Sequence, residues 1–121
     1  MATRKESTGK RDLTFSGWVR QKLPDSSTGY MVTDIDFVFF NYRTKKMMIC
    51  EIKTHNSSVK VWQKKFYEKL NTWIKKGIDD DWQYFGVNLI TFEKTCFEDG
   101  DVFFNNKKVN EDELIHILSL I

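Results

Sequence analysis

Two segments rich in β-branched and aromatic residues, 30–42 and 47–54, are joined by only four polar residues, RTKK. Runs of this composition and spacing are typical of a β-hairpin. Each segment nevertheless contains charged residues, which are Asp34, Asp36, Glu51 and Lys53. A charge in a folded core costs several kcal/mol unless it is paired or bound to a metal. These residues therefore either face solvent or take part in chemistry.

The four charged residues are predicted to share one face of the hairpin, because side chains alternate between the faces of a strand. If the chain turns tightly within RTKK, the numbers of directly opposed residues add up to 87. Asp36 then lies opposite Glu51, and Asp34 lies opposite Lys53, with Cβ atoms about 5 Å apart. Two carboxylates so close repel each other unless a cation binds, and carboxylate oxygens suit Mg²⁺ or Mn²⁺. The alternative is a half-exposed hairpin with cross-strand ion pairs.

The rest of the sequence predicts a mixed α/β domain. A short helix is expected before the hairpin, and a longer one after it, capped by Ser57 or Ser58 and ending near Lys76. Residues 84–92 are a predicted strand, followed by a small hairpin with Asp-Gly and Asn-Asn turn signals. Asn110 begins a capping-box pattern for a last helix.

The length of 121 residues suits one compact domain, expected at residues 13–121 after a flexible basic arm at residues 1–12. No apolar run of membrane-spanning length and no signal-peptide pattern is present, so we expect a cytoplasmic protein (in the host cell if viral) without a membrane partner. Residues 42–76 carry ten Lys or Arg against two Asp or Glu, whereas residues 77–121 carry three against ten. A basic centre of this kind favours binding of a polyanion.

The predicted long helix has an apolar stripe with two polar residues at its edge. The stripe consists of Val59, Trp62, Phe66, Leu70 and Trp73, and we expect it to pack on the sheet and to be buried there. Gln63 and Tyr67, at positions i and i+4, lie together along one edge, either for function or as ordinary boundary packing. The basic residues expected to contact a polyanion are Arg43, Lys45, Lys46, Lys60, Lys64, Lys65 and Lys69. A solvated lysine face is the alternative.

Taken together, these residues resemble the PD-(D/E)XK nuclease superfamily, especially its RecB-type and VRR-NUC branches, which include small phage nucleases and Holliday-junction resolvases. In that pattern an Asp on one core strand precedes an (Asp/Glu)-x-Lys on the next, and a helix with Q-x-x-x-Y follows. The matching residues here are Asp36, Glu51-Ile52-Lys53, Gln63 and Tyr67. The resemblance covers about residues 13–92 and implies a restriction-endonuclease-like αβββαβ core, to which a C-terminal hairpin and helix are added.

The resemblance also implies an activity, that of a Mg²⁺- or Mn²⁺-dependent DNA endonuclease that hydrolyses phosphodiester bonds. Asp36, Glu51 and the carbonyl of Ile52 would bind the ion, with Asp34 as an alternative or further ligand. Lys53 would stabilise the transition state. Gln63 and Tyr67 would complete the catalytic set, and a homodimer would suit paired cuts in branched DNA.

Two departures from the family pattern are visible in the sequence. Only GYMV precedes the acidic strand where the family has its first core strand. The Glu that members often carry on the first helix is missing, since only Glu6 and Asp12 are acidic before Pro24, where that helix is expected to end. Both departures concern the substrate class and the number of metal ions. Two other functions stay open as alternatives: a non-catalytic DNA-binding or recombination accessory module with the same fold, and a protein-interaction domain.

Overall fold

The computed structural model describes residues 11–55 and 57–121, and the chain divides into two compact units, Met1–Thr33 and Asp34–Ile121. The predicted arm at residues 1–12 lies largely outside the described residues. The first unit contains helix α1 (Arg11–Lys22), which confirms the short helix expected before the hairpin, and a 3-10 turn, η1 (Ser26–Thr28). No helix in the described ranges is long and apolar enough to cross a membrane.

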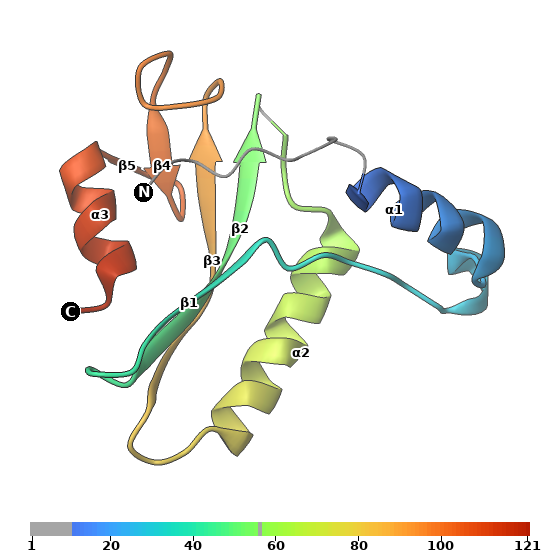
Figure 1. Cartoon of the computed structure of the whole chain (residues 1–121), viewed down its shortest axis with the longest axis horizontal. Helices are drawn as coiled ribbons and strands as arrows, with labels where there is room; N and C mark the ends of the chain where they lie inside the picture. The colour runs from blue at the N-terminus through green and yellow to red at the C-terminus, as the bar shows by residue number, and fades with distance from the viewer. Residues whose placement is uncertain (1–10, 56) are drawn as a thin grey trace. The chain divides into compact units, whose positions relative to one another are not determined.

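The second unit is an open five-stranded mixed sheet with two helices, which confirms the mixed α/β prediction (Figure 1). Its elements in chain order are β1 (Phe37–Asn41), β2 (Lys46–Thr54), α2 (Val61–Gly77), β3 (Gln83–Phe92), β4 (Val102–Phe104), β5 (Lys107–Val109) and α3 (Glu111–Ser119). The strands are ordered β1-β2-β3-β4-β5. Only β2 and β3 pair in parallel, which requires a crossover connection, and α2 forms it.

The C-terminal hairpin and helix form as predicted. Asn105 and Asn106 join β4 to β5 with φ angles of +50° and +69°, and asparagine tolerates such left-handed backbone better than most residues. At the start of α3, the Asn110 side chain accepts a hydrogen bond from the Glu113 N–H at 2.7 Å, and the Glu113 carboxylate accepts one from the Asn110 N–H at 2.8 Å. This reciprocal pair is a capping box.

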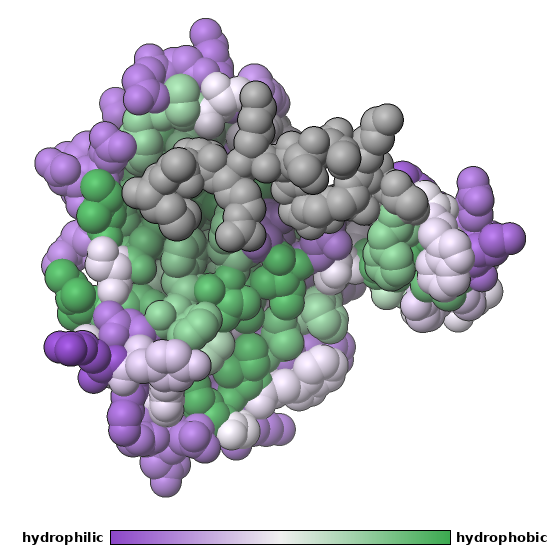
Figure 2. Space-filling view, in the orientation of Figure 1, coloured by the Kyte–Doolittle hydropathy of each residue, from purple (hydrophilic) through white to green (hydrophobic). Residues whose placement is uncertain are grey.

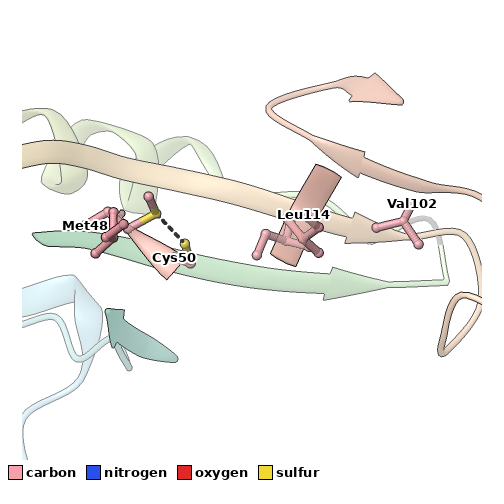
Figure 3. Packing of buried hydrophobic residues seen from close by; sticks show 6 residues of the cluster. Met48, Cys50, Val102 and Leu114 are labelled. Atoms are coloured by element: carbon pink, nitrogen blue, oxygen red, sulfur yellow. Dashed lines mark hydrogen bonds between the residues drawn. The ribbon is translucent and has the colours of Figure 1, made fainter. Parts of the chain in front are cut away.

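The hydrophobic core lies between the sheet and α3 (Figure 3). Its buried members are Met48, Cys50, Ile90, Val102, Leu114 and Leu120. Cys50 is a free thiol, as expected, and burial raises its pKa to about 12, so it stays protonated. Side chains alternate along β2, so Glu51 points away from this core and meets Tyr67 of α2. The helices α2 and α3 therefore cover opposite faces of the sheet.

A bulge in β3 fixes α2 against the sheet. Gly86 has a φ of +85°, a conformation that glycine adopts without strain, and the pairing with β2 shifts register next to it. The Asn71 side chain oxygen accepts hydrogen bonds from the Val87 N–H at 3.0 Å and from the Tyr84 hydroxyl at 2.7 Å. One residue of α2 thus satisfies two donors of β3, which sets how the helix lies over the charged residues of β2.

Candidate active site

The hairpin of β1 and β2 has the predicted register. Phe37 pairs with Cys50 and Asn41 pairs with Lys46, so paired residue numbers add up to 87. Extending this register by one residue places Asp36 opposite Glu51. Asp36 is close enough to Glu51 to act on it by both hydrogen bonding and charge. The register prediction is therefore confirmed over residues 37–41, and Asp36, one residue before that ladder, lies beside Glu51.

The acidic strand is shorter than predicted. The sequence indicated a strand over residues 30–42, but β1 spans Phe37–Asn41, so the prediction was wrong for residues 30–36 and for Tyr42. The Asp36 carboxylate accepts a hydrogen bond from the Ile52 N–H at 2.8 Å, in the place where a longer β1 would have supplied a backbone carbonyl. Asp34 lies further upstream, beyond the ladder that would have placed it opposite Lys53. The Asp36 side chain thus ends the pairing of β1 with β2 and holds this residue against β2.

Glu51 is the centre of this arrangement. It is 7% exposed, and its carboxylate accepts a hydrogen bond from the buried Tyr67 hydroxyl. The Lys53 ammonium lies 3.8 Å from the other carboxylate oxygen. Burial raises the pKa of Glu51, and the neighbouring Asp36 adds to the increase, while Tyr67 and Lys53 partly offset it. A buried acid next to a second acid is a site that favours a proton or a cation.

The backbone of Ile52 faces the same place as Asp36. Its N–H donates to Asp36, and within a strand the N–H and C=O of one residue point toward the same neighbour. The Ile52 carbonyl therefore points to the side of β2 on which Asp36 lies. Two carboxylates and one carbonyl are then available to a hard cation, which prefers oxygen ligands.

Within residues 11–55 and 57–121, no three or more His, Cys, Asp or Glu side chains are grouped in a way that could hold a metal ion. A metal at Asp36 and Glu51 would rely on these two carboxylates, the Ile52 carbonyl and water. That ligand set is compatible with Mg²⁺, which usually keeps several waters and binds through one or two carboxylates.

The start of α2 brings Gln63 and Tyr67 to this face of the sheet. The helix begins after Lys60, so the prediction that Ser57 or Ser58 caps it was wrong. Ser57 instead bonds back to Thr54, its hydroxyl donating to the Thr54 carbonyl at 2.7 Å. The Gln63 side chain oxygen accepts a hydrogen bond from the Lys60 N–H at 3.3 Å. Gln63 thus caps the first turn, and Tyr67, one turn later, contacts Glu51.

The predicted phosphate-binding residues fall into two groups. In the turn after β1, the Lys45 ammonium lies 2.6 Å from an Asp81 carboxylate oxygen, and the Lys46 ammonium donates to the Ile121 carbonyl at 3.1 Å. Arg43, in the same turn, is exposed. The second group is exposed at and after the start of α2, and consists of Lys60, Lys64, Lys65 and Lys69. The helix is therefore the better candidate for a DNA-binding face.

A cavity of about 460 Å³ adjoins Glu51, between β2, β3, the start of α2 and the β4–β5 turn. Lys64, Tyr67, Asn105 and Asn106 are among its lining residues. The sequence identified the two asparagines only as a turn, because nothing in their spacing says that β4 pairs next to β3. The sequence therefore did not predict that Asn105 and Asn106 line a cavity next to Glu51.

Comparisons with protein-family models, with characterised proteins and with solved structures find no match to this chain.

Proposed function

We propose that this protein is a metal-dependent DNA nuclease of the PD-(D/E)XK type. The proposal rests on one observation. Asp36 lies beside buried Glu51, and the Lys53 ammonium lies 3.8 Å from a Glu51 carboxylate oxygen. Two acids and a lysine, here one acid directly before β1 and the other two groups on β2, are the set that phosphodiester hydrolysis requires in that superfamily. The order α1, β1, β2, α2, β3 also agrees with the αβββαβ core if one early strand is absent.

Asp36, Glu51 and the Ile52 carbonyl would hold the divalent ion. When bound, such an ion lowers the pKa of a bound water and neutralises charge on the scissile phosphate. The residues fit this role because Glu51 is buried next to a second carboxylate, an arrangement whose repulsion a cation relieves. This relief is a reason for the fold to tolerate two acids at one point.

Two other side chains have roles that follow from their contacts. Lys53 provides a positive charge beside the carboxylates, where it would stabilise the negative charge that develops on a phosphoryl oxygen. Tyr67 donates to Glu51 and thereby fixes the orientation of that carboxylate. Tyr67 is thus a positioning residue, and the adjoining cavity offers room for a nucleotide at the cut.

A cleavage assay tests the proposal. Linear, circular and branched DNA would be incubated with the protein and Mg²⁺, Mn²⁺ or EDTA. Lys53→Ala would be compared with Lys94→Ala, an exposed lysine in the loop after β3. We expect cleavage with either metal, none with EDTA, and a loss of orders of magnitude in rate for Lys53→Ala only, as is typical when transition-state stabilisation is removed.

Three results would contradict the nuclease proposal. The first is cleavage that survives EDTA, and the second is an equal effect of the two lysine changes. The third is an absence of cleavage under all conditions. Salt-dependent DNA binding without any cleavage would favour the accessory DNA-binding module instead.

A further inference from the structure

The helix α2 leaves part of its own face of the sheet open. It contacts β3 through Asn71 and β2 through Glu51, whereas the same face of β1 has exposed apolar side chains. Val38 pairs with Ile49, two residues from Glu51, and so shares its face; Val38 is 44% exposed and Phe40, on the same face, 54%. Figure 2 shows apolar side chains gathered over the region of β1 and α2.

Two aromatic rings of α2 border this open face. Trp73 was predicted to lie in the buried stripe, but it is 56% exposed, so that prediction was wrong. Phe66, two turns earlier, meets it edge to face with ring centroids 6.2 Å apart. At about 100° per residue, both rings lie 100–120° around the helix from Tyr67, and on the opposite side from Asn71, which contacts β3. Phe66 and Trp73 therefore lie on the β1 side of α2.

The charge of α2 is positive and so complements that of a polyanion. The helix contains five lysines and a single acid, Glu68. A groove of about 410 Å³ is lined by Lys65, Lys69, Thr72, Trp73 and Glu68. An aromatic ring beside lysines, as Trp73 is in this groove, suits single-stranded nucleic acid, because its bases are free to stack while its phosphates contact cations. A duplex keeps its bases stacked inside and would contact the lysines alone.

We propose that this surface, formed by Val38 and Phe40 of β1 and by Phe66 and Trp73 of α2, binds an unpaired DNA strand that leads to the carboxylate pair. Trp73 follows Tyr67 by six residues, or about 9 Å of helix rise, which is the length of about three stacked nucleotides. Because the two side chains also point to different sides of the helix, a base stacked on Trp73 lies at least about three nucleotides from the bond to be cut. This inference deepens the proposed function and rests on it for the position of the cut, and it assigns substrates with an unpaired arm.

A binding assay in EDTA tests the surface without cleavage. A fluorescently labelled oligothymidylate and a duplex of equal length would be titrated with the wild type, Trp73→Ala, Trp73→Phe and Phe85→Ala. Phe85 is a matched control, since it is 44% exposed but lines a cavity with Met48 on the α3 face. We expect Trp73→Ala to weaken binding of the single strand roughly 5- to 100-fold, as loss of one stacked base does. Duplex binding should change less than about twofold, since phosphate contacts are unaffected.

The two control variants and a sedimentation measurement complete the test. Trp73→Phe keeps an aromatic ring and should restore most of the affinity, and Phe85→Ala should bind as the wild type does. Unchanged single-strand affinity in Trp73→Ala would overturn the inference, as would an equal loss for the single strand and the duplex. A wild type that sediments as a dimer and a Trp73→Ala variant that sediments as a monomer would also overturn it, because a second copy would then occupy the surface.

These outcomes separate the two proposals. If single-strand binding depends on Trp73 but no metal-dependent cleavage occurs, the binding surface stands and the nuclease proposal fails. If cleavage depends on Lys53 while single-strand binding ignores Trp73, the nuclease proposal stands and the binding surface fails.

Discussion

Replacing Tyr67 by phenylalanine removes the hydroxyl that donates to Glu51 and leaves the ring in place. Because Glu51 is 7% exposed, water cannot fully replace the lost donor. A hydrogen bond to a charged group contributes about 1.5–3 kcal/mol to the free energy of unfolding, against about 0.5–1.5 kcal/mol for a neutral one. Tyr67→Phe should therefore lower the free energy of unfolding at pH 7 by about 2 kcal/mol.

Tyr84→Phe is the matched control, because the Tyr84 hydroxyl of the wild type donates to the neutral side chain of Asn71 at 2.7 Å. Its expected cost is about 1 kcal/mol at every pH. The Tyr67 hydrogen bond lowers the pKa of Glu51, so its removal raises that pKa further above the ordinary value. The cost of Tyr67→Phe is therefore largest above the folded pKa of Glu51 and decreases as the pH falls through it.

Urea unfolding at pH 7 and pH 4 measures both effects, with midpoint shifts of about 1 M expected for Tyr67→Phe at pH 7 from the usual dependence on denaturant. Equal costs for the two tyrosine variants at pH 7 would contradict a hydrogen bond from Tyr67 to an ionised Glu51. A cost for Tyr67→Phe that does not change with pH would also refute it, since the acceptor would then not be an ionised Glu51.

Three further predictions concern single elements of the structure. Glu51→Gln removes an acid whose pKa is raised by burial and by the neighbouring Asp36. The free energy of unfolding of this variant, relative to that of the wild type, should therefore rise as the pH increases from 4 to 7. A difference that falls over this range in urea unfolding would contradict this. Asn71→Ala leaves two donors of β3 without their acceptor and should lower the free energy of unfolding by about 1–3 kcal/mol in the same assay, whereas a neutral result would mean that water replaces the amide. The triple change to glutamine of Lys60, Lys64 and Lys65 should weaken DNA binding and flatten its salt dependence from a log–log slope of about −4 to −5, if about five lysines contact phosphates. The control triple is Lys94, Lys107 and Lys108, outside α2, and an unchanged slope would reject the lysine face of α2.

The sequence predicts the local elements and the hairpin register because these depend on short-range patterns. Only four residues join β1 to β2, and such a short turn leaves few registers open, so the pairing of residues 37–41 with β2, and with it the place of Asp36 beside Glu51, could be predicted. The capping box at Asn110 and the turn at Asn105 and Asn106 are equally local. Each feature depends on the backbone conformation and hydrogen bonds of a few neighbouring residues.

The errors arise where tertiary contacts override a pattern. Residues 30–36 have the composition of a strand, but Asp36 uses its side chain in place of the ladder, so β1 starts at Phe37. Trp73 follows the apolar period of α2, yet the helix is held over β3 by Asn71 and leaves this ring exposed. Periodicity identifies an apolar stripe, whereas the width of the sheet beneath it decides how much of that stripe is buried.

The proposed nuclease activity depends on the claim that Asp36 and Glu51 share one hard cation, and a Mn²⁺ titration followed by isothermal calorimetry measures that shared site. We expect one Mn²⁺ site per wild-type chain at millimolar Mn²⁺, with Mg²⁺ competing for it, and its loss in both Asp36→Asn and Glu51→Gln. Circular dichroism of both variants would verify that they remain folded. Mn²⁺ binding that is unchanged in folded Glu51→Gln, or that is absent from the wild type, would contradict the claim.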